Sequence, residues 1–128
     1  GCSFLEKKMK ISSDYLDVVK QGMYNVVNVP GGTAYRSHFN INGMEMAGKT
    51  GSTQVRRISM KERQTRILRQ DELPWKYRDH ALFIAFAPYD NPRYGVAVLV
   101  EHGGGGSSVA APIASEILQE ALRLNIIK

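Results

Sequence analysis

The residues Gly48-Lys49-Thr50-Gly51 have the types and spacing to take part in chemistry, because a lysine and a hydroxyl stand between two glycines. Two kinds of site use such a group. In a phosphate-binding loop, the glycines let backbone N–H groups surround a nucleotide's phosphates, the lysine reaches the terminal phosphates and the hydroxyl binds magnesium. In the other kind, the group lies on a β-strand and lines the edge of a cleft. The flanking sequence decides between these two chemistries.

The phosphate-loop pattern G-x-x-x-x-G-K-[ST] is formally satisfied by Gly43 together with Gly48-Lys49-Thr50. This pattern requires a buried strand before it and a helix that begins at the lysine. Segment 36–42 is too polar for a central parallel strand, and the glycine and β-branched residues of segment 51–55 disfavour a helix. The strand and helix alternation of a parallel sheet is also missing. A P-loop-like nucleotide-binding protein therefore remains only an alternative.

The second interpretation places the group on a strand. Residues 44–55 can run extended, and Gly48 and Gly51 would leave room for another backbone to approach closely. Lys49 and the neighbouring hydroxyls would then line the edge of a cleft. Three residues alone are weak evidence for such a site, because a solvated lysine on an ordinary strand is common, so the remaining sequence has to support it.

The composition is that of a soluble globular protein, with 43% hydrophobic and 23% charged residues among 128. This length predicts a single unit over residues 1–128, and no apolar run approaches the ~18 residues that span a bilayer. No metal site or cofactor is expected, since His38 has no second ligand at metal spacing.

Much of the net charge of +5 is concentrated in residues 56–80, where eight basic residues stand against four acidic ones. Basic runs can contact nucleic-acid phosphates. Here, however, acids are mixed through the run, its aromatic residues are Trp75 and Tyr77, and no known nucleic-acid motif is present. We expect a solvated charged excursion between strands and no nucleic-acid partner. A non-catalytic basic module that docks an acidic partner is a further alternative.

An early helix is predicted after Ser12-Ser13-Asp14, which offers an N-cap. Apolar residues then recur at helical spacing and predict one buried stripe, formed by Leu16, Val19, Met23, Val26 and Val27. Pro30 and the glycines that follow it end this helix and open a loop.

Two apolar runs, 81–87 and 94–100, have the length of strands, and the turn residues Asp90-Asn91-Pro92 lie between them. They predict an antiparallel hairpin. Because neither run alternates with polar residues, we expect both faces of the sheet to be covered, with one helix in front and one behind.

A final helix is predicted after the glycines 103–106, capped by Ser107 or Ser108 and with Pro112 near its first turn. Its apolar face is predicted to consist of Ile113, Ile117, Leu118, Ala121 and Leu124. The resulting fold class is α+β, an antiparallel sheet of about three strands flanked by helices.

Five local motifs occur in a fixed order along the chain. They are Met46-Ala-Gly-Lys-Thr-Gly51, Asp79-His-Ala-Leu-Phe83, Phe86-Ala-Pro88, Val100-Glu-His-Gly-Gly-Gly-Gly106 and Ala110-Ala-Pro-Ile-Ala114. Together they resemble bacterial penicillin-binding protein 2, the elongation-specific class B family of penicillin-recognising serine enzymes. The resemblance runs from about residue 12 to 124 and implies the C-terminal part of a β-lactamase/transpeptidase-like fold.

The resemblance implies D,D-transpeptidation, in which a serine attacks a D-Ala-D-Ala stem peptide and a neighbouring strand's amine resolves the acyl-enzyme. It implies that Lys49 supplies positive charge and a proton-relay contact beside the nucleophile. Thr50 and Ser52, and the adjacent Thr53, would offer hydroxyls to the substrate carboxylate. Gly51 would let the acyl chain lie along the strand, and the Ser52 N–H would be one of two oxyanion donors. The family usually has threonine where Ser52 stands, which weakens the expected carboxylate contact of its side chain.

The other family motifs are missing, because no serine has lysine three places on or asparagine two places on. The interpretation is that the chain is a fragment, truncated upstream of the early helix together with a membrane anchor, and that it does not react with β-lactams by itself. For the parent protein, the resemblance implies the periplasmic face of the bacterial inner membrane. The implied partners are stem peptides, β-lactam antibiotics and membrane proteins of cell elongation.

Overall fold

The elements follow one another in the predicted order in the computed structural model, which describes residues 9–127. The main elements are helix α1 (Ser13–Asn28), strands β1 (Ala47–Thr53), β2 (His80–Ala87) and β3 (Tyr94–Val100), and helix α3 (Ala111–Ile127). The strands form one antiparallel sheet in the order β1-β2-β3. The predicted α+β class, with a three-stranded antiparallel sheet flanked by helices, is confirmed.

Strand β2 lies in the centre of the sheet, and its residues are flanked on both sides. Phe83, for example, lies opposite Thr50 of β1 and Val98 of β3. The β2–β3 hairpin begins and ends where the two apolar runs do, to within one residue. Strand β1 is an edge strand, and no described residue pairs with its outer side.

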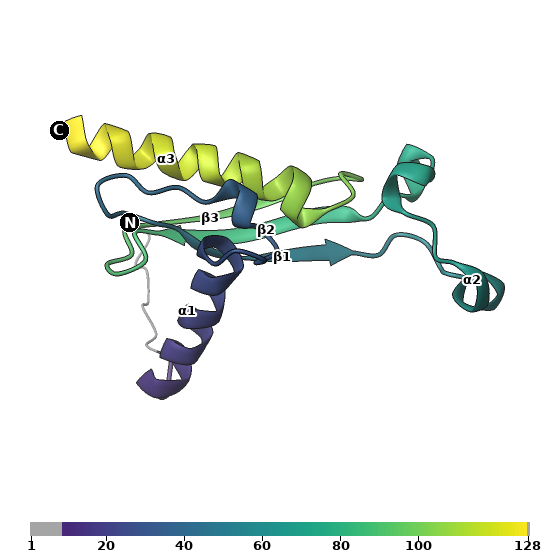
Figure 1. The fold of residues 1–128 in the computed structure, drawn as a ribbon, viewed down its shortest axis with the longest axis horizontal. Coiled ribbons are helices and arrows are strands. Elements are labelled where there is room, and N and C mark those ends of the chain that lie inside the picture. The colour runs from purple at the N-terminus through teal and green to yellow at the C-terminus, as the bar shows by residue number, and fades with distance from the viewer. Residues whose placement is uncertain (1–8, 128) are drawn as a thin grey trace, which may run out of the picture.

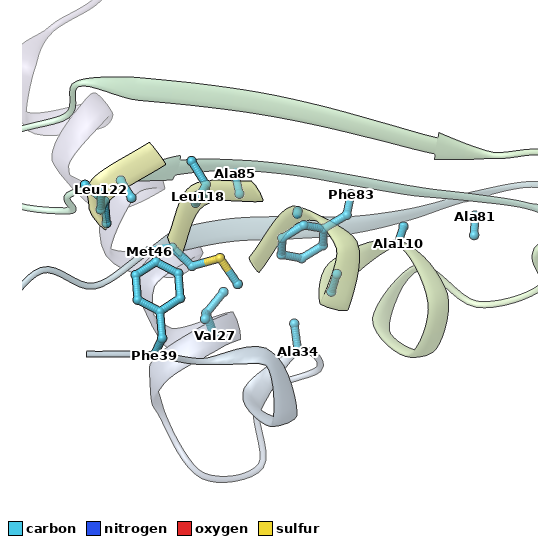
Figure 2. Packing of buried hydrophobic residues seen from close by; sticks show 13 residues of the cluster. Val27, Ala34, Phe39, Met46, Ala81, Phe83, Ala85, Ala110, Leu118 and Leu122 are labelled. Carbon is cyan, nitrogen blue, oxygen red and sulfur yellow. The ribbon is translucent and has the colours of Figure 1, made fainter. Parts of the chain in front are cut away.

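One face of the sheet packs against α3 to form the core. In Figure 2, Phe83 and Met46 point into the space between the sheet and the helices, and both are fully buried. Leu118 and Leu122 of α3 and Val27 of α1 complete the set of large buried side chains. Burying a side chain of this size contributes about 1.5–3 kcal/mol.

The described residues leave the opposite face of the sheet largely open, which corrects the expectation that both faces are covered. Side chains there belong to alternate residues of β2 and β3, and Ile84 is 50% and Leu99 60% exposed. An apolar run without polar alternation therefore shows that both faces of a strand are suited to burial. It does not show that residues of this chain bury them. Figure 1 shows α3 lying along the sheet while α1 projects away from it beside β1.

Helix α1 begins as predicted, since the Ser12 hydroxyl accepts a hydrogen bond from the Asp14 N–H at 3.3 Å. The predicted buried stripe is wrong in the first half of the helix. Leu16 and Val19 are 42% and 58% exposed, and within α1 only Val27 is fully buried. The helix meets the sheet at its carboxy-terminal end, where Val26 also packs against the core, so Leu16 and Val19 lie beyond the packed part of the helix.

The final helix also differs from its prediction in register. A five-residue π-turn, Gly106–Ala110, precedes α3, and no serine side chain caps it. The buried side of the helix includes Leu118 as predicted, whereas Ile113, Ile117 and Leu124 are 40%, 48% and 54% exposed. The buried positions of α3 are instead Ala111, Ala114, Ser115, Leu118 and Leu122.

Between β1 and β2 the chain makes a charged excursion over residues 54–79. It contains the short helix α2 (Met60–Thr65) and two 3₁₀ turns, Gln70–Glu72 and Trp75–Tyr77. In Figure 1 it extends beyond the end of the sheet. Among the residues described, no helix combines the length and the apolar character needed to cross a bilayer.

Candidate active site

The predicted site residues all lie on β1, but their side chains are divided between the two faces of the strand. Lys49 lies opposite Ile84, which places its side chain on the open face of the sheet. Thr50 and Ser52 lie opposite Phe83 and Ala81, on the face towards α3. Gly51 and Thr53 return to the open face. Because β1 is an edge strand, both sets border the same free backbone edge.

The Lys49 ammonium group folds over this edge. Its Nζ donates a hydrogen bond to the Thr50 carbonyl at 3.0 Å and lies 3.5 Å from the Thr50 hydroxyl. Lys49 is exposed and forms no salt bridge with any other described residue. The edge therefore presents one uncompensated cation next to a hydroxyl, which suits an anionic group of a ligand.

Strand β1 has little side-chain volume of its own, and close backbone contacts hold it in place. A Cβ atom on Gly48 would lie 2.5 Å from the Phe83 ring, so only glycine fits there without a shift. A Cβ atom on Gly106 would lie 2.8 Å from the Gly51 carbonyl oxygen and 2.5 Å from that of Leu82. Another backbone, that of the π-turn before α3, does approach Gly51 closely. The room for it comes from Gly106, because a Cβ atom on Gly51 would lie in ordinary contact with Leu82 at 3.5 Å.

The local structure excludes a phosphate loop. Gly43 lies in a turn in which its N–H donates to the Asn40 side chain at 2.8 Å. Lys49 and Thr50 lie inside a strand and not at the start of a helix, and the next helix begins only at Met60. The N–H groups of this segment therefore do not form the cradle that a nucleotide phosphate requires.

A cavity of about 280 Å³ lies beside the end of β1. Ser52 of β1 and Gln54, which follows the strand, line one side of it. Gln70 of the excursion and Asp79, which directly precedes β2, line the other. The side chains of Arg56, Ile58, Ile67 and Leu68 complete its wall. The charged excursion therefore forms one wall of the space next to the predicted site.

The excursion is held together by charge pairs. Arg56 forms a two-bond salt bridge with Glu62 at 2.5 and 2.8 Å, and the side chains of both residues are less than a fifth exposed. The hydrogen bonds from Arg56 and from the Leu68 N–H lower the pKa of Glu62 to about 2. Hydrogen bonds from the Arg69 N–H and from Arg66 also lower the pKa of Glu72. Since these pairs use four of its charged groups, the excursion carries less free charge than its sequence suggests.

Three residues next to β1 were not assigned a role from the sequence. Asp79 and Gln70 form hydrogen bonds to each other, Asp79 also accepts one from the Val55 N–H just after β1, and Gly106 packs on Gly51. Asp79 and Gly106 each belong to a motif that was noticed in the sequence. Their contacts join segments that are far apart in the chain, so spacing alone could not reveal them.

Comparisons with known proteins agree with this geometry. The family described as penicillin binding protein transpeptidase domain matches residues 5–119. The peptidoglycan D,D-transpeptidase MrdA of Salmonella typhimurium is 40% identical over 107 residues, which are 84% of this chain and 16% of the relative. The protein of the same name from Haemophilus influenzae is 42% identical over 102 residues, or 80% of this chain and 15% of the relative. The chain thus spans about one sixth of the length of these relatives.

Solved structures show the same fold. A complex of penicillin-binding protein PBP2 with MreC from Helicobacter pylori is similar with a TM-score of 0.67 at 29% identity, covering 89% of this chain and 19% of that chain. The PBP2 of Pseudomonas aeruginosa in complex with WCK 5153 is similar with a TM-score of 0.57 at 36% identity, covering 79% and 18%. The family match covers most of this chain, the relatives exceed 30% identity, and the structural neighbours share the sheet and helices. This chain belongs to the penicillin-binding protein transpeptidase family.

Proposed function

We propose that this chain forms the Lys-Thr-Gly part of the catalytic domain of a peptidoglycan D,D-transpeptidase. The observation that carries the proposal is the edge strand β1, which presents Lys49, Thr50 and Ser52 along a backbone edge that no other described strand pairs with. An extended peptide can add to such an edge through main-chain hydrogen bonds. The family membership and the names of the relatives support the same reaction.

The reaction has two acyl-transfer steps. The oxygen of a serine that is not among this chain's motifs bonds to the carbonyl carbon of the penultimate D-alanine of a stem peptide. The terminal D-alanine leaves as an amine that gains a proton. The amine of a second stem peptide then attacks the ester carbon and forms the cross-link. The serine oxygen leaves and regains a proton.

In this scheme the residues of β1 bind and orient the acyl donor. Lys49 provides a positive charge next to the serine and assists proton transfer. The hydroxyls of Thr50 and Ser52, which share the face towards α3, are offered to the terminal carboxylate of the donor, and Thr53 offers its hydroxyl from the other face of the strand. The Ser52 N–H donates to the carbonyl oxygen as negative charge develops on it, and such a donor contributes about 2.7–4 kcal/mol to transition-state stabilisation. Gly51 keeps the strand clear where the acyl chain lies.

The same proposal extends to β-lactams and to cellular partners. A β-lactam presents an acyl group and a carboxylate like those of the donor peptide, so it is expected to occupy the same edge. The complete enzyme would act at the periplasmic face of the inner membrane together with membrane proteins of cell elongation. The structure of a Helicobacter pylori neighbour in complex with MreC supports such an assembly.

A segment exchange tests the proposal. The matched segment of the Salmonella relative is replaced by the corresponding residues of this chain, and the hybrid is incubated with benzylpenicillin and weighed by intact-mass spectrometry. We expect a mass increase of one penicillin in the hybrid and none in the 128-residue chain alone.

Two matched variants of the hybrid test whether β1 contributes to acylation. Lys49→Ala is expected to slow acylation by a factor of about 100 or more, in line with the loss of one electrostatic contact to the transition state. Lys61→Ala removes an exposed lysine of α2 and is expected to leave the rate unchanged. A folded hybrid that gains no penicillin, or an equal loss in the two variants, contradicts the proposal.

A further inference from the structure

A single residue, Asp79, joins the segment just after β1 to the excursion and to the glycine loop of residues 103–106. Its Oδ1 accepts a hydrogen bond from the Val55 N–H at 3.4 Å, just beyond the last residue of β1. Its Oδ2 accepts one from the Gln70 side chain at 3.2 Å, and the side-chain carbonyl oxygen of Gln70 accepts one from the Asp79 N–H at 2.7 Å. Both side-chain oxygens and the N–H of Asp79 are therefore in use.

The main-chain carbonyl of Asp79 makes the fourth connection. It accepts a hydrogen bond from the Gly104 N–H at 3.0 Å, in the glycine loop of residues 103–106. Gly104 has a φ of +92°, and a Cβ atom there would lie 3.3 Å from Cβ of Gln70. The glycine loop can thus come this close to Gln70 because it has no side chain at this position.

This junction lies next to the predicted chemistry. Asp79 and Gln70 line the cavity that Ser52 also lines. Val55 is three residues beyond Ser52, and the glycine loop continues into the π-turn whose Gly106 packs on Gly51. A displacement of Asp79 would therefore reach β1 both through Val55 and through the glycine loop.

We propose that Asp79 is a positioning residue that fixes the end of the Lys-Thr-Gly strand for acyl transfer. The proposal rests on the proposed function, because it assigns Asp79 to the same site. Asp79 does not touch the reacting atoms in this account. It acts through β1, by holding Ser52 and its N–H at a fixed place relative to the excursion and the glycine loop.

The glycine loop has a second attachment that does not depend on the Asp79 side chain. The His102 N–H donates to Nδ1 of His80 at 3.0 Å, and the His102 ring lies 3.0 Å from the Arg78 carbonyl oxygen through its own Nδ1. The indole ring of Trp75 also packs on His102 at 4.4 Å between ring centres. A variant at Asp79 is therefore expected to remain folded.

The test uses Asp79→Asn in the 128-residue chain, with Asp71→Asn as a matched control. The substitution keeps the shape of the side chain but places an NH₂ group against either the Val55 N–H or the Gln70 NH₂ group, so one contact is lost. We expect the Val55 amide to exchange with solvent roughly tenfold faster, and the Ser52 and Thr53 amide resonances to shift. The side chain of Asp71 is 72% exposed, and its substitution is expected to leave these resonances in place.

A double variant that exchanges donor and acceptor between positions 70 and 79 distinguishes a positioning role of Asp79 from a general loss of stability. In the double variant Asp79→Asn, Gln70→Glu, the carboxylate introduced at position 70 can accept from the side-chain amide and from the main-chain N–H at position 79. The contact between the two side chains is thus restored with donor and acceptor exchanged. We expect the Ser52 resonance and the Val55 exchange rate to return towards the values of the unchanged chain.

In the segment-exchanged transpeptidase, Asp79→Asn is expected to slow penicillin acylation about tenfold with little change in thermal midpoint, and the double variant to recover most of the rate. Unmoved Ser52 and Val55 amides, an equal response to Asp71→Asn, or an unchanged acylation rate overturns the role of Asp79. If the unsubstituted hybrid fails to acylate, the proposed function fails, while the amide measurements still decide whether Asp79 positions β1.

Discussion

Strand β1 and the β2–β3 hairpin belong to one sheet but are held in it by different means. The hairpin contributes a row of buried side chains to the core, with Phe83 fully enclosed between the sheet and α3. In β1, only the first two residues, Ala47 and Gly48, are buried, and the rest of the strand consists of small polar residues, one glycine and one lysine. The strand that carries the chemistry therefore contributes little to the core.

The difference shows where the position of the site is determined. Phe83 packs where Gly48 has no side chain, Gly106 packs on Gly51, and Asp79 holds Val55. Each of these contacts comes from outside β1. An edge strand can thus expose its backbone and polar side chains to a ligand because neighbouring segments supply the packing that it lacks.

The largest expected effect comes from removing the hairpin's central side chain. Phe83→Ala empties a fully buried position and should destabilise the chain by about 3–5 kcal/mol, as is usual for such truncations. Ile84→Ala, one residue further on the half-exposed side, should cost about 1 kcal/mol or less. Urea unfolding curves of the two variants measure the difference. Similar losses in both would contradict the difference in packing between the two faces of the sheet.

A smaller effect is expected where the π-turn meets β1. Gly106→Ala would place a methyl group against two backbone oxygens and should destabilise the chain by about 1–3 kcal/mol while shifting the Gly51 and Ser52 amide resonances. Gly105→Ala is the control. Within 3 Å its Cβ atom would meet only the hydroxyl of Ser108, and that side chain can turn away. The two variants are compared by urea unfolding and by amide spectra. Equal stability with unchanged β1 resonances in Gly106→Ala would contradict the claim that this contact positions the strand.

The smallest effect is expected in the excursion, at low pH. The pKa of Glu62 is about 2 in the folded chain against an ordinary value of 4.5, so the folded form binds fewer protons. The stabilisation from its salt bridge is therefore complete above pH 4.5 and is lost as the pH falls from 4.5 towards 2. The Leu68 amide, which donates to Glu62 at 3.0 Å, reports the change and should titrate with a midpoint near 2.

The matched variant for this titration is Arg56→Gln, which removes the principal cause of the low pKa of Glu62. The midpoint of the Leu68 amide should then rise towards 4.5, while resonances of the β2–β3 hairpin stay in place. A midpoint near 4.5 in the unchanged chain would mean that the Arg56 and Glu62 pair is not formed in solution.

The parts of the fold that the sequence predicted well are those fixed by local signals. The hairpin was found because two apolar runs flank strong turn residues, and the start of α1 was found because Ser12 is a good N-cap. The position of the Lys-Thr-Gly group on a strand followed from the glycine and β-branched residues around it, which do not favour a helix. These signals act over a few residues, so the sequence displays them directly.

The errors concern contacts between distant segments. Helical spacing identified which residues of α1 share a face, but it could not show that the contact with the sheet ends near Val27. Helical spacing also did not show which face of α3 meets the sheet, so the predicted apolar face missed Leu122 and Ser115. The junction at Asp79 escaped prediction for the same reason, because it joins residues 55, 70, 79 and 104.

The most direct test of the central claim is to follow the amide resonances of the ¹⁵N-labelled chain during a titration with a β-lactam, with magnesium and ATP as the matched control. If β1 is the ligand-facing edge of a transpeptidase site, saturating β-lactam should shift the resonances of Lys49–Thr53, and magnesium with ATP should shift none of them. A response of Gly43–Thr50 to magnesium and ATP, together with no response of β1 to saturating β-lactam, would contradict this function.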